Sequence, residues 1–459
     1  MRERWAKTLV ARKVVEEQEP EARYRRRMDR LQAILEGLDP AAHYVEPDLE
    51  PPPSGAARNP ETAVRIERLR ALNDALLQAP SGFAFHRKLE KARDKRRHAL
   101  DDLDARTIDW ALAEELALAS LIEDGVAIRL TGEDVERGTF SHRHAVFHDA
   151  RTGATHTPLQ QLPQGRAAFE IHNSALTENA ALGFEYGYNV QAPDRLVIWE
   201  AQYGDFINGA QVMIDEFIAS ARSKWGLKPS LVLLLPHAHE GQGPDHASAR
   251  PERFLQLAAD VNMRVVNCTT AAQYFHVLRR QAALLRTDPL PLIVLSPKSL
   301  LRHPATLSTP RELAQGRWQR VIEDASARER ASQIRRLILC SGKIYVDLVT
   351  SERNKDAKAV AITRIEQLYP FQASELRAAM AGWPDLEEVV WVQEEPENMG
   401  AWRRLRTQFG ERLIGRWPWK AICRPESASP ATGSPGGHKL EQDALVARAL
   451  GLTSAGASR

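Results

Sequence analysis

Cysteine is scarce in this chain, and the cysteines that are present form no recognisable pairing pattern. The 459 residues include three cysteines that lie far apart in sequence and show no CxxC spacing, namely Cys268, Cys340 and Cys423. A disulfide framework needs an even set of cysteines at regular spacings, so this pattern favours a reducing compartment. We therefore expect a cytoplasmic protein.

Long hydrophobic runs and a strong net charge are missing as well. The most apolar run, residues 231–235, has only the length of a strand, and no segment could span a bilayer. Residues 1–7 lack the apolar core of a signal peptide, and the glutamates that soon follow argue against a transit peptide. A formal net charge of +2 is too balanced for a nucleic-acid or anionic-membrane partner. We expect neither partner.

The pattern of apolar segments predicts an α/β fold. Residues 1–58 suggest two charged helices and a proline-rich linker at 46–55, after which Asn59 and Pro60 are typical of a helix start. Short apolar strands alternate with helices over residues 59–307 and again over residues 308–459. Such strands predict parallel sheets covered on both faces, hence two α/β domains preceded by a helical segment.

The polar segments between and after the apolar strands also have a predicted structure. We expect a polar helix at residues 308–327, between the two alternating blocks, and a long loop at residues 425–437, which are rich in serine, proline and glycine. The basic run at residues 87–97 has interleaved acids and no aromatic residues, so it indicates a solvated helix face.

One acid stands at the expected start of a helix. Thr177 is a good N-cap, and Glu178 follows it at the head of an alanine-rich helix. By spacing alone, such an acid commonly complements the helix dipole. The helix start favours the ionised carboxylate, whereas burial against an apolar ring favours the protonated form, and proton exchange needs these effects to balance near working pH.

A loop rich in glycine and histidine follows the apolar strand at 231–235. Its sequence, residues 236–250, is PHAHEGQGPDHASAR, and ligands of α/β sheets bind at such strand ends. Three histidines could suggest a metal site, but His237, His239 and His246 lack zincin or zinc-finger spacing. We predict no metal site here.

Residues 198–211 form a second candidate segment at a strand end. The strand and the helix that follows it would place Gln202, Tyr203 and Phe206 at one lip of the sheet. By themselves, these residues indicate ordinary aromatic packing.

Residues 174–187, SALTENAALGFEYG, resemble a segment of thiamin diphosphate enzymes, in particular the decarboxylating component of the 2-oxoglutarate dehydrogenase complex. Further segments resemble the same family in the same order, from about residue 137 to the C-terminus: 137–144, 236–250, 296–302, 364–370, 394–402 and 424–430. The resemblance implies a pyrimidine-binding domain at 59–307 and a transketolase-like C-terminal domain at 308–459. Residues 1–40 resemble the tail of the domain that precedes this region in the family.

The resemblance also implies roles for individual residues. Glu178 would exchange a proton with a ring nitrogen of the cofactor, and Leu176 would wedge against the ring. The residues that would shape the cofactor pocket, where an aromatic wall stacks on the pyrimidine, are Gln202, Tyr203 and Phe206. His246, with His237 as a second candidate, would contact the substrate or the intermediate formed after decarboxylation.

Some positions depart from the family pattern. Asn179 replaces a second acid, which leaves Glu178 as the carboxylate to choose. His239 stands where relatives usually have an aromatic residue, so we assign it no role. Ser141 replaces a phenylalanine, which weakens any role for His142 and His144.

The family holds the cofactor diphosphate through Mg²⁺ bound by a Gly-Asp-Gly sequence. This chain contains no Gly-Asp-Gly, no P-loop and no GxGxxG. Glu178 and aromatic side chains cannot hold Mg²⁺ and a phosphate group. We therefore expect the chain to bind the pyrimidine half of thiamin diphosphate, with Mg²⁺ supplied by a subunit that bears the diphosphate-binding domain.

The predicted function is oxidative decarboxylation of 2-oxoglutarate with transfer of the succinyl group to lipoamide, in a homodimer or heterotetramer that serves a lipoyl acyltransferase. The alternative is a non-catalytic partner, or a truncated remnant, that binds a full-length relative or the acyltransferase core. Another thiamin enzyme, such as a transketolase, is weakened by the match of the loop at 237–250.

Overall fold

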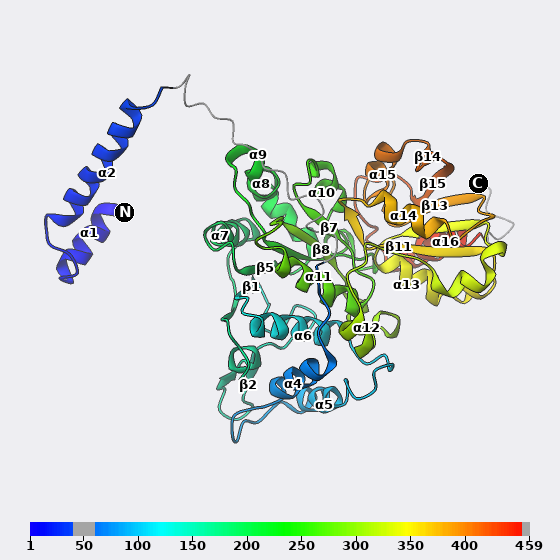
Figure 1. The fold of residues 1–459 in the computed structure, drawn as a ribbon, viewed down its shortest axis with the longest axis horizontal. Helices are drawn as coiled ribbons and strands as arrows, with labels where there is room; N and C mark the ends of the chain where they lie inside the picture. The colour runs from blue at the N-terminus through cyan, green and yellow to red at the C-terminus, as the bar shows by residue number, and fades with distance from the viewer. Residues whose placement is uncertain (40–59, 452–459) are drawn as a thin grey trace. The chain divides into compact units, whose positions relative to one another are not determined.

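Two separate units make up the described part of the chain, which comprises residues 1–39 and 60–451 of a computed structural model. The first unit consists of two helices, α1 (Arg2–Ala11) and α2 (Glu19–Glu36), in agreement with the predicted pair of charged helices (Figure 1). The linker predicted at residues 46–55 lies outside the described residues.

A seven-stranded sheet forms the centre of the first half of the second unit, with the strand order β12-β7-β8-β6-β5-β1-β4. Its strands are β1 (Ile128–Gly132), β4 (Phe169–Asn173), β5 (Leu196–Glu200), β6 (Val232–Pro236), β7 (Arg264–Val266), β8 (Leu292–Ser296) and β12 (Gln367–Tyr369). All neighbours are parallel except β12, which pairs antiparallel with β7.

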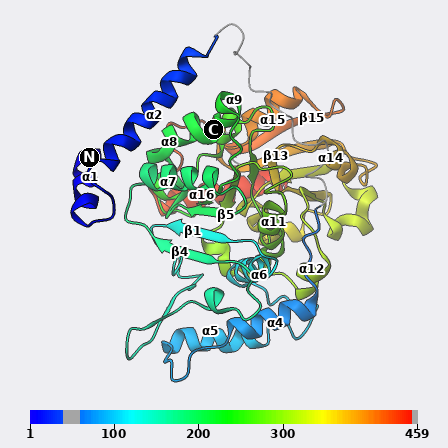
Figure 2. The same cartoon turned by 60° about the vertical axis from the view of Figure 1, so that its left-hand side comes forward.

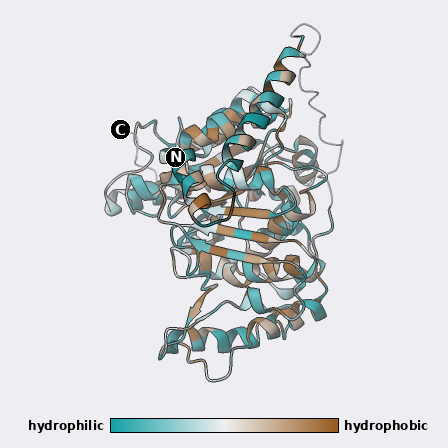
Figure 3. Cartoon of the chain, turned by 90° about the vertical axis from the view of Figure 1, so that its left-hand side faces the viewer, coloured by the Kyte–Doolittle hydropathy of each residue, from teal (hydrophilic) through white to brown (hydrophobic). Residues whose placement is uncertain are grey.

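Both faces of this sheet are covered, as its apolar strands predict. Along β6, Val232 and Leu234 face a core that includes helices α6 and α11, whereas Leu233 and Leu235 face a core that includes α7 and α10. Brown, apolar segments run along the strands of this sheet in Figure 3. The helices of these cores are α6 (Trp110–Glu123), α7 (Glu178–Gln191), α10 (Pro251–Leu257) and α11 (Ala271–Ala283).

A six-stranded sheet, ordered β14-β15-β13-β10-β11-β9, forms the second half. Its strands are β9 (Val321–Ile322), β10 (Arg336–Cys340), β11 (Val360–Ile365), β13 (Glu388–Pro396), β14 (Arg412–Leu413) and β15 (Trp417–Arg424). The four central strands are parallel and the edge strands β9 and β14 are antiparallel. The helices that accompany it are α13 (Lys343–Thr350), α14 (Ala373–Met380), α15 (Trp402–Phe409) and α16 (Pro435–Ala449).

The two sheets share one core. The cluster that lies on one face of the first sheet continues to Leu337, Val389 and Trp391 of the second. Strand β12 follows β11 in sequence yet pairs with β7 of the first sheet. The α/β fold class is therefore confirmed. The division at residues 307 and 308 stays a prediction.

The helices α4 (Ile66–Leu76) and α5 (Arg87–Arg97) lie beyond α6, on the side away from the first sheet (Figure 2). The helix start expected at Asn59 and Pro60 is wrong, because α4 begins at Ile66 and residues 60–65 are not helical. The Thr62 hydroxyl lies 2.9 Å from His276 Nδ1, and the Thr62 carbonyl accepts from Arg279. Contacts with α11 thus outweigh the local helix signal.

Two further expectations need correction. The helix expected at residues 308–327 is broken into α12 (Pro310–Gln315), strand β9 and a 3₁₀ segment η7 (Ala325–Gln333), since β9 pairs with β11. The loop expected at 425–437 ends early, because α16 already begins at Pro435, where Ser434 accepts the Gly437 amide as its cap.

The remaining elements are short. They are β2 (Phe147–His148), β3 (Thr155–His156), α8 (Gln211–Met213), the π-helix η3 (Ile214–Ile218), α9 (Ala221–Trp225) and the 3₁₀ segments η1 (Pro158–Gln161), η2 (Gly204–Ala210), η4 (Pro244–His246), η5 (Ser299–Arg302), η6 (Pro304–Thr306) and η8 (Glu352–Lys355). Among the described helices, none combines the length and the apolar character that a bilayer crossing requires.

Candidate active site

Glu178 is the first residue of α7, as predicted. Thr177 occupies the N-cap position with extended backbone, but its side chain makes no capping hydrogen bond. The Glu178 side chain is half-buried, and its Oε2 atom lies 3.6 Å from the position that a Cβ would take at Gly209. Leu176, just before the helix, is 59% exposed. A carboxylate and an exposed apolar side chain thus lie together at the start of α7.

An aromatic cluster includes three of the residues predicted from the sequence. The Tyr203 ring lies 4.4 Å from the His246 ring and 5.7 Å from the Phe206 ring, in edge-to-face geometry that aromatic pairs prefer. The Phe140 ring lies 5.6 Å from the Tyr203 ring, also in edge-to-face geometry. Gln202, next to Tyr203, is half-buried.

The segment η2 connects these two groups of residues. It carries Phe206 of the aromatic cluster and Gly209 beside Glu178, and it packs against α7. A Cβ at Gly204 would come within 2.5 Å of the Pro236 carbonyl and 2.6 Å of Ala249 Cβ. Only glycine permits this close approach of η2 to the glycine- and histidine-rich loop.

Three buried polar side chains hold the turn that carries His246. Asp205 accepts from the backbone amides of Ala247 and Ser248, at 3.1 and 2.9 Å. His237 Nδ1 accepts from the Ala249 amide at 3.1 Å. Lys298 donates to the His246 carbonyl and to Gln242. We name residues 246–249 the His246 turn.

Burial affects the titration of these groups. It raises the pKa of the Asp205 carboxyl, against which the amides of Ser248 and Ala247 act. It also lowers the pKa of Lys298. The Asp205 Oδ2 atom is buried and has no hydrogen-bond partner among the described residues. A buried oxygen without a hydrogen bond costs free energy of folding, and such unsatisfied groups often mark functional sites.

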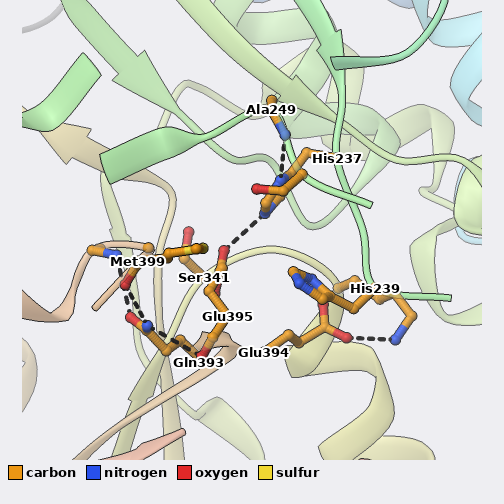
Figure 4. A network of polar contacts seen from close by, with 12 residues as sticks. His237, His239, Ala249, Ser341, Gln393, Glu394, Glu395 and Met399 are labelled. Atoms are coloured by element: carbon orange, nitrogen blue, oxygen red, sulfur yellow. Dashed lines mark hydrogen bonds and ion pairs between the residues drawn. The ribbon is translucent and has the colours of Figure 1, made fainter. Parts of the chain in front are cut away.

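His237 contacts a carboxylate from the second sheet. Its Nε2 atom lies 2.8 Å from Glu395 Oε1 on β13, opposite the contact with Ala249 (Figure 4). Burial alone would lower the pKa of His237, but the hydrogen bond and the charge of Glu395 outweigh it and raise the pKa. Burial likewise opposes the ionised form of Glu395, yet His237 holds the pKa of Glu395 below its ordinary value.

The other histidine of this loop differs in both contacts and charge. His239 is completely buried and donates from Nε2 to the Pro430 carbonyl at 3.0 Å. Burial lowers the pKa of His239 to about 3. It is therefore neutral at physiological pH, in a structural contact with the segment before α16.

A buried ion cluster lies behind the aromatic residues. Arg143 donates to Glu114 at 3.1 Å and to Glu200 at 3.0 Å, and the Tyr274 hydroxyl donates to Glu114 at 2.6 Å. Despite its burial, Glu114 has a lowered pKa because of Arg143. Glu200 ends β5, immediately before the segment with Gln202 and Tyr203. The cluster thus fixes the strand end that leads into the site.

The histidines next to this cluster are uncharged. Burial, followed by the charge of Arg143, lowers the pKa of His142 to about 4. The pKa of His144 is also lowered, chiefly by burial. The arrangement therefore places one neutral imidazole, that of His142, beside Phe140.

Three buried charged residues of the site, Asp205, Lys298 and Glu395, had no predicted role. Each lies in a segment that had been singled out, at 198–211, 296–302 and 394–402. Their residue types were a usable signal in the sequence, because an acid or a lysine close to the end of a buried strand needs a polar or charged partner. Which partner it has depends on the tertiary structure.

The residues present suit the aromatic half of a bound cofactor better than its phosphates. Glu178, Leu176 and the cluster around Phe206 offer a carboxylate, an exposed apolar side chain and aromatic rings. Within residues 1–39 and 60–451, no group of three or more histidine, cysteine, aspartate or glutamate side chains is arranged to hold a metal ion.

Comparison with known proteins relates the chain to one enzyme family. Residues 106–304 match the transketolase pyrimidine-binding domain, and residues 307–450 match the 2-oxoglutarate dehydrogenase C-terminal domain. The 2-oxoglutarate dehydrogenase E1 component of Bacillus cereus is 48% identical over 417 residues, which are 90% of this chain and 43% of that protein. Its counterpart in Bacillus mycoides is 49% identical over 395 residues, which are 85% of this chain and 41% of that protein.

The chain spans about two fifths of the length of these curated relatives. The two matching domains occur consecutively and together include the residues described above. The chain therefore carries a transketolase-type pyrimidine-binding domain and a 2-oxoglutarate dehydrogenase C-terminal domain, and it is similar to the C-terminal part of the 2-oxoglutarate dehydrogenase E1 component.

Proposed function

We propose that the chain forms the pyrimidine-binding and C-terminal part of a thiamin diphosphate-dependent 2-oxoglutarate dehydrogenase. The observation that carries the proposal is the position of Glu178, half-buried at the start of α7. It lies beside Gly209 of η2, the segment that also carries Phe206 of the aromatic cluster with His246. The relatives are named as 2-oxoglutarate dehydrogenase E1 components, which supports this class of reaction. The reaction that we propose is decarboxylation of 2-oxoglutarate, followed by transfer of the succinyl group to lipoamide.

In this proposal each site residue has one task. Glu178 holds or releases a proton at a ring nitrogen of the aminopyrimidine, while Leu176 packs against the ring. The pocket is completed by Gln202, Tyr203 and Phe206. His246 contacts the substrate or the intermediate formed after decarboxylation, with His237 as the second candidate for this contact. The cofactor, when bound, supplies the electron sink for decarboxylation, and the protein supplies position and proton transfer.

The diphosphate and its Mg²⁺ need ligands that Glu178 and the aromatic cluster do not offer, because Mg²⁺ prefers oxygen ligands in octahedral geometry. A Gly-Asp-Gly sequence outside these 459 residues would supply them, on a separate subunit or on further sequence of the same polypeptide. We propose the cytoplasm as the compartment, in keeping with three buried free thiols, and a lipoyl acyltransferase as the acceptor of the product.

The second candidate is a scaffold that binds a full-length relative or the acyltransferase core without catalysis. Leu176 before α7, Phe184 within α7 and Val212 just after η2 are exposed apolar side chains, and a partner would cover them in either case. The two candidates therefore differ in Glu178, which only an enzyme requires.

The test combines the chain with a polypeptide that bears the diphosphate-binding domain, thiamin diphosphate and Mg²⁺, and measures 2-oxoglutarate-dependent reduction of a dye. Glu178→Ala should lower the rate by about 100-fold or more, as loss of an acid–base group does. Asn179→Ala, on the same exposed turn, is the matched control and should leave the rate unchanged. Equal rates for the two variants, or no gain over the separate polypeptides, would contradict the enzyme proposal.

A further inference from the structure

The C-terminal part of the chain contacts the loop of the candidate active site through a buried carboxylate. Glu395 on β13 meets His237, which directly follows β6. Both side chains are almost fully buried, so the contact is shielded from water. The roles assigned above leave Glu395 without a task, although taking a carboxylate out of water is costly.

The two nitrogen atoms of His237 have different partners. Nδ1 receives the Ala249 N–H, so it must carry a lone pair. Nε2 faces the Glu395 carboxylate, so it must carry the hydrogen. The arrangement therefore fixes one neutral tautomer, in the way that a carboxylate orients a catalytic imidazole.

Ala249 belongs to the His246 turn, whose other supports are Asp205 and Lys298. Asp205 and Lys298 both come from the first sheet and its loops. Glu395 is the support that comes from the second sheet, and it acts through His237.

We propose that Glu395 is a positioning residue: it keeps the proton of His237 on Nε2, leaves Nδ1 to accept the Ala249 amide, and so holds the turn that presents His246. The C-terminal domain thereby completes a site that otherwise lies on the pyrimidine-binding domain. The part that concerns substrate rests on the proposed function, whereas the link from Glu395 to Ala249 does not.

Protonation of His237 would break this link. A doubly protonated ring has a donor at Nδ1, which cannot accept the Ala249 amide, although the cation still pairs with Glu395. The charged groups that face the ring are Glu394 and Glu395 on β13 and Asp205 on η2, while His239 beside it is neutral. The carboxylates favour the cation, so the turn is held above the raised pKa of His237 and released below it.

Two substitutions of Glu395 separate tautomer control from packing. Glu395→Gln keeps an oxygen that accepts from Nε2 but removes the charge. Glu395→Leu removes the acceptor and keeps a similar volume. Glu388 lies at the other end of β13, where it pairs with Arg336 and Lys420, and it serves as the matched control with the same two replacements.

The first experiment uses the chain alone. Nitrogen-15 NMR of labelled histidines reports the tautomer and the pKa of His237, and hydrogen exchange reports the protection of the Ala249 amide. Glu395→Gln should lower the pKa of His237 and keep both the tautomer and the protection. Glu395→Leu should lose the tautomer preference and exchange Ala249 about tenfold faster, the effect of one lost hydrogen bond.

An unchanged tautomer and unchanged Ala249 protection in Glu395→Leu would overturn the proposal. If Glu395→Leu does not fold, the Glu395→Gln variant tests the proposal by itself. An unchanged pKa of His237 in that variant would show that His237 and Glu395 do not interact, and would overturn the proposal. The two Glu388 variants should leave both measurements at the wild-type values.

The second experiment uses the complete assembly and the dye assay. Glu395→Leu should lower kcat by up to about 100-fold, as small displacements of a catalytic group do, and Glu395→Gln should retain the wild-type rate at pH 8. Wild-type kcat in Glu395→Leu would overturn the positioning role. An inactive wild-type assembly would contradict the proposed function instead, and the measurements on the chain alone would still decide the link to Ala249.

Discussion

Arg143 offers the most direct test of how this site is supported. Its guanidinium is buried between the carboxylates of Glu114 and Glu200, which have few other partners. Arg143→Met fills a similar volume but leaves two carboxylates buried without a cation. Breaking a buried ion pair in this way costs about 3–5 kcal/mol.

The sign of the pH dependence follows from the pKa of Glu114. In the wild type Arg143 lowers this pKa, so the contribution to stability is present above the unfolded pKa and is lost as pH falls through the folded one. In Arg143→Met, burial outweighs the remaining hydrogen bond from Tyr274 and raises the pKa of Glu114. The contribution of Glu114 to the free energy of unfolding is then present below its unfolded pKa and is lost as pH rises through its folded pKa. The variant should be closer to the wild type at pH 5 than at pH 8.

Hydrogen exchange of the β5 amides at pH 5 and pH 8 measures this effect, after correction for intrinsic rates. A loss of about 3–5 kcal/mol corresponds to exchange that is about 100- to 4000-fold faster at pH 8. Adding Glu114→Gln and Glu200→Gln should restore most of the protection, because neutral amides need no cation. The exposed pair of Arg311 and Asp104 supplies the control Arg311→Met. An equal loss of β5 amide protection at pH 5 and at pH 8 in Arg143→Met would refute the inference that Arg143 stabilises the ionised carboxylates.

The remaining predictions concern packing and reactivity. Gly204→Ala should destabilise the chain by about 1–3 kcal/mol, because the added methyl group would overlap the Pro236 carbonyl and Ala249; thermal unfolding measures this, and Gly187→Ala, where no atom lies within 4 Å, is the control. The three buried thiols should not react with Ellman's reagent at pH 8 unless the chain is unfolded. Burial raises the pKa of Cys423 to about 11 and those of Cys268 and Cys340 further above the ordinary value, so fast labelling of the native chain would contradict the buried positions.

Patterns that depend on neighbours in sequence could be predicted well. Strand β6 and helix α7 follow from a run of apolar residues and from a threonine before an acid, which are local signals. The aromatic cluster was predicted in part, since Tyr203, Phe206 and His246 lie in two segments that follow neighbouring strands. Parallel strands bring such segments to the same edge of a sheet.

Contacts between distant segments could not be predicted in this way. The extended residues 60–65 carry a good helix signal, yet hydrogen bonds to α11 and α12 decide their conformation. Strand β12 joins the first sheet although it follows a strand of the second. In both cases hydrogen bonds that close over long stretches of chain outweigh a weak local preference.

By itself, the sequence determined the α/β class, the main alternation of strands and helices, and the position of Glu178 at a helix start, because periodicity and capping depend on residues that are close in sequence. The tertiary structure alone decided that Glu395 meets His237, that Asp205 and Lys298 hold the His246 turn, and that Arg143 lies between two carboxylates. A buried charge is stable only beside its partner, and that partner is chosen by how the two sheets pack together.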